Sequence, residues 1–230
     1  MDGFTVIIPA KNEAELLPAT LAGLQDPSLT SAIAHVVVVD DGSEDSTAQV
    51  ARRAGAAVVT LSKSRGKANA LTVGVVHATQ HGLRGQSGVL LLDADVGSTV
   101  GGVTPVLDAV MSGTCDLAIA KYSARGATGG RGLVVGLAAR GIERRTGWVP
   151  SVPLSGIRAM TWSALATVSP LAQGWGVETG MTIDALRGGL RVVEVETSMK
   201  HRATSNDWRG QVHRGRQYLD VQRALLKRPG

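Results

Sequence analysis

The stretch AHVVVVDDGSEDSTAQVARRAG, residues 34–55, joins two different hydrophobic periodicities. Its first part is a continuous apolar run that ends at Asp40 and Asp41, which is the pattern of a buried strand. Its second part has the spacing of a helix, and we predict Ser43 as the N-cap and Gly55 as the stop of that helix. A strand followed directly by a helix predicts a parallel sheet with both faces covered.

The same alternation extends along the chain on both sides of this stretch. Further strands are predicted at residues 4–10, 56–62, 88–96, 115–123 and 190–198. Helices are predicted at residues 11–24, 66–82, 103–113, 133–147, 162–168 and 177–189, and from Asp207 onward. Neither a repeat nor a linker is visible, so we predict one α/β domain of two unequal halves. The turns from strand to helix collect at one sheet edge, where open α/β sheets bind ligands.

Composition indicates a globular, cytoplasmic enzyme. Of the 230 residues, 43% are hydrophobic and 19% are charged, which is ordinary for a soluble domain. The apolar runs are too short to span a bilayer, and residues 4–8 end at Pro9 without a basic leader. The single cysteine, Cys115, excludes an internal disulfide and a multi-cysteine zinc cluster.

Positive charge is concentrated in the C-terminal segment. From Lys200 onward the chain has eight Lys or Arg residues, against Asp207 and Asp220. Such a segment suits an anionic lipid or a phosphorylated small molecule, or is simply a solvated helix. Aromatic residues make up only 3% of the chain, which argues against a nucleic-acid partner that stacks its bases on the protein.

Two common nucleotide-binding motifs are absent. The first predicted strand is followed by IPAKNEAEL (residues 8–16), where a dinucleotide fold would carry G-x-G-x-x-G. Pro9 has no N–H to donate to a phosphate, and Glu13 would repel one. Gly66 and Lys67 lack the spacing and the hydroxyl residue of a P-loop.

Polar residues follow the predicted strands instead. In GVLLLDADV (residues 88–96), Asp93 and Asp95 come directly after a buried run, where they either face water or hold a cation. Closely spaced carboxylates suit Mg²⁺, which keeps part of its shell for water and phosphate. Lys67, at a neighbouring strand end, suits a phosphate oxygen. A metal-bound diphosphate would account for the lysine and both aspartates together.

Four segments, in this order and spacing, resemble the nucleotide-binding half of GT-A glycosyltransferases of the family 2 type: VIIPAKNEAELL, VVVVDDGSEDST, GKANAL and LLLDADV. In the second half, PLSGIRAM, GWGVETGMTIDAL and the following HR are similar to the glucosyl-3-phosphoglycerate synthase branch. The resemblance implies a GT-A fold, with a Rossmann-like, mostly parallel half that binds a nucleotide sugar (residues 1–100). A smaller half would bind the acceptor and end in a basic helix (residues 101–230).

The resemblance also implies site residues. The positions that match donor contacts are Pro9, Ala10, Asn12, Glu13, Asp41, Gly66, Lys67, Asp93, Ala94, Ser155 and Gly156. Asp95, the second member of the D-x-D pair, and His201 match the metal ligands. A carboxylate pair alone suits Mg²⁺, whereas an imidazole ligand favours Mn²⁺. We expect Asp95 to bind the metal directly and Asp93 to contact ribose or a coordinated water.

The acceptor side is less determined. Glu178 begins a predicted helix, where the helix dipole favours it, and the resemblance implies that it orients the sugar or acts as a general base. Trp175 either stacks on a sugar or packs in the core. Gly130 and Arg131 match an acceptor loop for a small anion, but Leu133 replaces the threonine expected there. The alternative acceptor is a lipid phosphate, with peripheral membrane contact. Its candidate contacts are His213, Arg214 and Arg216 in the basic tail.

Two other functions remain open at this stage. A sugar-1-phosphate nucleotidyltransferase has a similar sheet, although its Gly-rich, Arg-containing turn is missing after residue 10. The second alternative is a degenerate transferase that only binds a nucleotide sugar. The retained polar residues argue against it, namely Asp93, Asp95, Lys67 and His201. The donor sugar, the base, inversion or retention at the anomeric carbon, and the oligomeric state are left undetermined.

Overall fold

The computed structural model describes residues 2–122, 132–199 and 208–229, and their side chains except those of residues 208–214. The strands are β1 (Phe4–Ala10), β2 (Ile33–Asp40), β3 (Ala57–Thr60), β4 (Gly88–Leu91), β5 (Leu117–Tyr122), β6 (Arg158–Met160) and β7 (Val192–Thr197). The α-helices are α1 (Leu17–Leu24), α2 (Pro27–Thr30), α3 (Thr47–Arg53), α4 (Lys67–Gln80), α5 (Thr104–Met111), α6 (Gly132–Thr146), α7 (Trp162–Thr167), α8 (Val177–Arg187) and α9 (Trp208–Leu226). The 3₁₀ helices are η1 (Gly97–Val103) and η2 (Gly174–Gly176).

The strands form one seven-stranded sheet in the order β3-β2-β1-β4-β6-β5-β7. Strands β3, β2, β1 and β4 are parallel, and β6 runs antiparallel to its neighbours β4 and β5. Ala10 pairs with Asp40 at the last position of the β1–β2 ladder. The loops after these parallel strands therefore meet at one edge of the sheet, as the sequence predicts.

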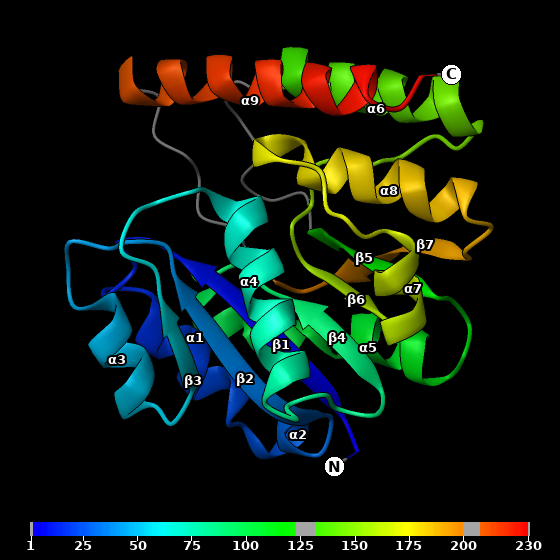
Figure 1. The fold of residues 1–230 in the computed structure, drawn as a ribbon. Helices are drawn as coiled ribbons and strands as arrows, with labels where there is room; N and C mark the ends of the chain where they lie inside the picture. The colour runs from blue at the N-terminus through cyan, green and yellow to red at the C-terminus, as the bar shows by residue number, and fades with distance from the viewer. Residues whose placement is uncertain (1, 123–131, 200–207, 230) are drawn as a thin grey trace.

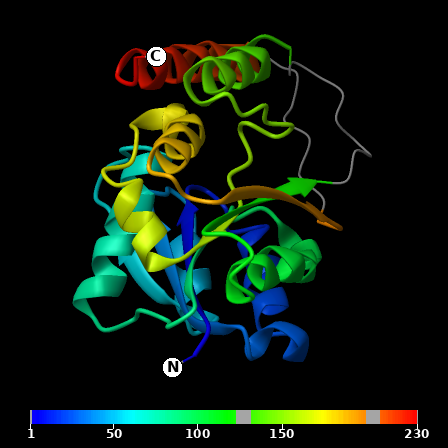
Figure 2. The ribbon, with the colours of Figure 1, turned by 90° about the vertical axis from the view of Figure 1, so that its right-hand side faces the viewer.

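Helices cover both faces of the sheet (Figure 1). One hydrophobic cluster packs α1, η1 and α5 against one face, and a second packs α4, α7 and α8 against the other. Beyond α8 lies an outer layer of α6 and α9, which run side by side in both views (Figures 1 and 2). A third cluster, containing Ile142, Ile183 and Val221, joins this layer to α8. None of the described helices is both long and apolar enough to cross a membrane.

The predicted α/β fold is confirmed, with differences at the element ends. Helix α3 begins at Thr47, not near Ser43, because Asp45 accepts a hydrogen bond from the Thr47 N–H, at 2.9 Å. The prediction of Ser43 as N-cap is therefore wrong. Helix α1 begins only at Leu17, and β4 ends at Leu91. The η1 helix was not predicted.

Candidate active site

The loops that follow β1 and β2 are bonded to each other. The N–H of Asn12 donates to Ser43 Oγ at 2.9 Å, and Asn12 Oδ1 accepts from the Glu44 N–H at 2.8 Å. The Glu13 N–H donates to Thr47 Oγ1, also at 2.9 Å. Asn12 has a φ of 55°, a conformation that asparagine tolerates better than most residues. The predicted donor residues Asn12 and Glu13 thus lie on a loop that the neighbouring strand holds in place.

Asp41 organises the entry to helix α4. Its carboxylate is almost fully buried and accepts three hydrogen bonds, from Ser64 Oγ (2.7 Å) and from the N–H groups of Arg65 and Gly66 (both 2.8 Å). Gly66 has a φ of 88°, which a side chain would strain. The carboxylate therefore fixes the turn that presents Lys67, the first residue of α4.

Lys67 joins three segments of the site. Its Nζ lies 2.7 Å from Asp93 Oδ1 and 2.9 Å from Glu178 Oε1. The side chains of Lys67 and Asp93 are each 17% exposed and that of Glu178 is 7% exposed. Burial opposes the charged ammonium, but the two carboxylates outweigh this effect and raise the pKa of Lys67. Residues from α4, the loop after β4, and α8 thus form one charged centre.

Gly156 closes one side of this centre. A Cβ at this position would lie 2.3 Å from Lys67 Nζ and 2.8 Å from Asp93 Oδ2, so a side chain there would displace one or both of these groups. The neighbouring Ser155 is buried and donates its hydroxyl to the carbonyl of Ala120 at 2.7 Å. Ser155 and Gly156, both predicted as donor-binding residues, therefore form a wall beside the charged centre, with Gly156 directly against it.

Arg158 supports that wall from beneath and was not among the predicted residues. It is fully buried; Nε donates to the Ser155 carbonyl and Nη1 donates to Thr182 Oγ1, both at 2.9 Å. Burial lowers the pKa of Arg158 to about 10, although the charge of Glu178 opposes the shift. A lone arginine within the apolar run GIRAM was the signal in the sequence.

Glu194 on β7 holds the start of the loop that leads to Ser155 and Gly156. Its carboxylate accepts from the N–H of Ser151 and from the N–H of Val152, each at 2.9 Å, and from the Ser151 hydroxyl. In the sequence Glu194 lies in an alternating strand and looks like an ordinary solvent-facing residue. Pairing across 42 residues of chain cannot be anticipated from that pattern.

Asp95 differs from Asp93 in its surroundings. It is partly exposed and forms neither a hydrogen bond nor an ion pair with another described residue. Among the described residues, no group of three or more His, Cys, Asp or Glu side chains could hold a metal ion together. Mg²⁺ and Mn²⁺ accept one or two carboxylates and complete their shell with water and substrate phosphate, so Asp95 fits such an ion. The other predicted ligand, His201, lies outside the described residues.

The remaining predicted residues have different surroundings. Pro9 and Ala10 end β1, and the Ala10 carbonyl accepts from the Asp41 N–H at 2.8 Å. The side chain of Ala94 is buried in the core, so only its backbone lies between the two aspartates. Trp175, on η2, is partly exposed, and its backbone N–H donates to Asp220 Oδ2 at 3.2 Å. Gly130 and Arg131 lie outside the described residues.

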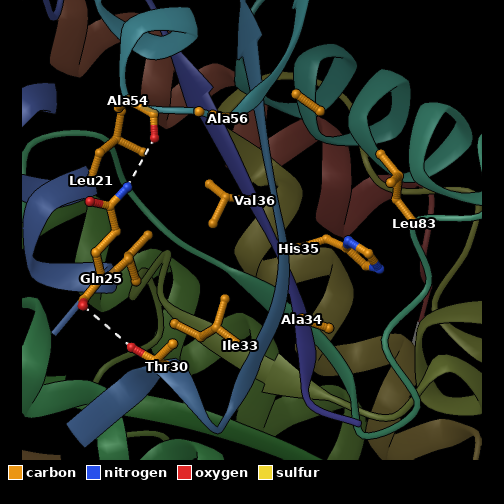
Figure 3. A pocket seen from close by; sticks show the side chains of 13 residues that line it. Leu21, Gln25, Thr30, Ile33, Ala34, His35, Val36, Ala54, Ala56 and Leu83 are labelled. Atoms are coloured by element: carbon orange, nitrogen blue, oxygen red, sulfur yellow. Dashed lines mark hydrogen bonds between the residues drawn. The ribbon is translucent and has the colours of Figure 1, made fainter. Parts of the chain in front are cut away.

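A separate cavity of about 390 Å³ lies at the opposite edge of the sheet (Figure 3). Its lining includes Val36 and His35 near the start of β2, and Leu21 and Gln25 at the end of α1. These residues lie near the ends at which the strands begin, whereas Asp41 and Asp93 follow the ends at which β2 and β4 finish. The cavity therefore does not include the charged centre.

Comparison with known proteins identifies the family. The family described as glycosyl transferase family 2 matches residues 5–144. Glycosyltransferase AglJ of Haloferax volcanii is 29% identical over 210 residues, which is 90% of this chain and 66% of that protein. An uncharacterised glycosyltransferase of Mycobacterium tuberculosis is 31% identical over 208 residues, covering 86% of this chain and 85% of its own length.

The fold is also similar to solved structures. Glucosyl-3-phosphoglycerate synthase from Mycobacterium tuberculosis, in complex with phosphoglyceric acid, has a TM-score of 0.78 and 24% identity, covering 99% of this chain and 80% of that one. In a complex with Mn²⁺, UDP-glucose and phosphoglyceric acid it has a TM-score of 0.74 and 25% identity, covering 99% of this chain and 79% of that one. The predicted GT-A fold is confirmed. Because the family match covers more than half of the chain, this protein belongs to glycosyltransferase family 2.

Proposed function

We propose that this chain moves a sugar from a nucleotide-diphosphate donor to an anionic acceptor, with Asp95 as a ligand of a divalent metal. The observation that carries the proposal is the position of Lys67 between Asp93 and Glu178, beside a second aspartate without a described partner. An ammonium group and a metal-binding carboxylate at one sheet edge suit a diphosphate, which gains negative charge as the sugar departs.

The residues divide the chemistry between them. A divalent ion bound at Asp95, with His201 as its second proposed ligand, would neutralise part of the charge on the leaving diphosphate. The Lys67 ammonium, bonded to Asp93 and Glu178, offsets part of the negative charge of these two carboxylates beside the donor site. Glu178 and Asp93 fix the position of the Lys67 ammonium, and the absence of a side chain at Gly156 lets this ammonium and the Asp93 carboxylate lie against the backbone there.

Similar proteins support the choice of substrates. The mycobacterial synthase was crystallised with Mn²⁺, UDP-glucose and phosphoglyceric acid, and with Mg²⁺ and UDP. A human dolichyl-phosphate β-glucosyltransferase is 36% identical over 107 residues, or 40% of this chain and 30% of its own length. We therefore propose a uridine-diphosphate sugar as donor and a phosphate-bearing acceptor, either a small acid held by Gly130 and Arg131 or a polyprenyl phosphate.

A nucleotide-release assay tests the proposal. Purified protein is incubated with UDP-sugars and Mn²⁺, with phosphoglyceric acid or a polyprenyl phosphate as acceptor, and the release of UDP is measured. We expect UDP release that depends on both metal and acceptor. Donor binding without turnover on any acceptor would favour the non-catalytic module. Release of pyrophosphate from a nucleoside triphosphate would favour the nucleotidyltransferase.

A further inference from the structure

The outer layer of α6 and α9 has an exposed face that the active site does not use. The exposed side chains of α9 are those of Arg216, Leu219, Arg223 and Leu226, with Lys227 directly after the helix, whereas Val221, Ala224 and Leu225 are buried. At 100° per residue, the exposed positions occupy one stripe of about 100° directly opposite the buried ones. The stripe combines positive charge with two large apolar side chains.

Helix α6 repeats the arrangement. Its exposed residues include Leu133, Arg140, Arg144 and one acidic residue, Glu143, and its buried ones are Val134, Ala138, Gly141 and Ile142. The exposed positions again lie opposite the buried ones. Because the two helices lie side by side over α8, both exposed stripes face away from the body of the protein (Figures 1 and 2). We call these nine residues, eight apolar or basic and one acidic, the outer stripe.

The outer stripe is rigidly held. Gly141 brings α6 against Leu225 of α9, where a Cβ would lie 2.5 Å from the leucine side chain. Arg145 donates to the Leu225 carbonyl at 2.9 Å and so caps the end of α9. Arg228 forms an ion pair with Asp184 of α8 at 2.5 Å. These contacts tie the C-terminal ends of α6 and α9, which carry Arg144 and Leu226, to each other and to α8.

The residue types of the outer stripe indicate what kind of partner it binds. Leu133 and Leu226 are each 78% exposed and Leu219 is 51% exposed, so three of the six large apolar side chains that are exposed in the described part of the chain lie on this face. Arg223 is paired with Asp220, but Arg140, Arg144, Arg216 and Lys227 form no ion pair with a described residue. Like charges disfavour a second copy of the same face, and a nucleic acid offers nothing apolar to the leucines.

We propose that the outer stripe docks on the surface of an anionic lipid bilayer. Basic side chains would contact the anionic head groups while the leucines enter the interface beneath them. The inner side of α9 contacts η2, through Asp220 and the Trp175 N–H, and η2 leads directly into Glu178. Docking would thus bring the active-site end of the molecule close to the membrane, whichever acceptor the enzyme uses.

Vesicle sedimentation tests this proposal on the whole chain. Wild-type protein is mixed with phosphatidylcholine vesicles, with or without phosphatidylglycerol as a third of the lipid. We expect binding only to the anionic vesicles and weaker binding at high salt, because salt screens the basic side chains. Equal binding to both lipids, or binding to neither, would overturn the proposal.

Matched variants assign any binding to the stripe. The double variant Arg140→Glu with Arg144→Glu should lower vesicle partitioning about twentyfold or more. The control Arg52→Glu with Arg53→Glu, on exposed positions of α3, should leave it unchanged. Leu226→Ser should lower partitioning about fivefold, whereas Met111→Ser, at a 46% exposed position of α5, should not.

The same variants separate the other partners. If the stripe variants bind vesicles as the controls do, the proposal is wrong. If they instead dissociate a dimer in light scattering, or lose binding to RNA while vesicle binding stays unchanged, another partner occupies the face. UDP release with a water-soluble acceptor is measured in parallel, so that failure of docking is distinguished from failure of the proposed function.

Discussion

Asp93 and Asp95 are two positions apart in the chain, yet their carboxylates have different partners. Lys67 neutralises Asp93, while Asp95 has no partner among the described residues. A carboxylate already bonded to an ammonium is a poorer site for a cation than one that is not. We therefore keep the proposal that Asp95 binds the metal, whereas Asp93, which we expected on ribose or a coordinated water, is bonded to Lys67 in this structure.

Lys67→Met should destabilise the protein as well as inactivate it. Removal of the ammonium leaves Asp93 and Glu178 facing each other, which we expect to cost about 2 kcal/mol in the free energy of unfolding. Urea denaturation of both proteins at neutral pH measures the difference. A Lys67→Met protein as stable as the wild type would show that the ion pairs contribute nothing.

The same ion pairs predict a pH dependence. The pKa of Lys67 is raised in the folded protein, so its contribution to stability is complete below the unfolded value of 10.5 and is lost as the pH rises through the folded value. The stability difference between wild type and Lys67→Met should therefore stay constant from neutral pH to about 10 and shrink above it. Denaturation at several alkaline pH values tests this window, and a difference that grows there would contradict it.

Gly156→Ala should displace Lys67, because the new Cβ would lie 2.3 Å from its Nζ. We expect UDP release to fall at least about tenfold, since small misplacements of site groups are costly. Gly101→Ala is the control, because a Cβ there meets nothing within 4 Å. Equal activity of the two variants would mean that Lys67 can move away from the new Cβ without loss of function, which would contradict this prediction.

At the scale of elements, β6 is a short strand with a structural purpose. It carries Arg158, which connects the Ser155 turn to Thr182 of α8 and so joins two sides of the active site. Burial destabilises the charged form of Arg158, as its lowered pKa shows. Burying Arg158 is costly, yet it is bonded to both walls of the site. Its role is therefore better explained by the positioning of these walls than by a gain in the stability of the protein.

Arg158→Met should therefore separate activity from stability. Relief of the buried charge offsets the two lost hydrogen bonds, so we expect the free energy of unfolding to change by less than about 2 kcal/mol. Activity should fall at least about tenfold, mainly in kcat. Thermal denaturation and UDP-release kinetics measure the two effects. A strongly destabilised variant whose remaining folded fraction is fully active would identify Arg158 as purely structural.

At the scale of the whole molecule, local patterns explain what could be predicted. Apolar runs and glycine stops, such as Gly55 and Gly82, indicate most elements because they depend on neighbours in sequence. The parallel arrangement then brings residues 41, 67 and 93 to one edge. Ser43 was misassigned because the chain forms a turn before the helix, in which Asp45 accepts from the Thr47 N–H, and the N-cap position is Ser46.

Other features depend on contacts between distant segments. The Arg158 and Glu194 supports need partners that are far away in the chain, and no periodicity encodes them. The layer of α6 and α9 could be predicted as two helices, but not as neighbours. Their outer stripe becomes visible only when the exposed positions of both helices are compared.

The central claim is that Asp95 binds a divalent metal that holds the donor diphosphate. Thermal denaturation is measured with UDP-sugar, with and without Mn²⁺, on wild type, Asp95→Asn and the control Asp108→Asn, an exposed carboxylate on α5. We expect UDP-sugar with Mn²⁺ to stabilise wild type and Asp108→Asn, by about 2.7 kcal/mol at a hundredfold excess over Kd, and to leave Asp95→Asn unchanged. Equal metal-dependent stabilisation of all three proteins would contradict the claim.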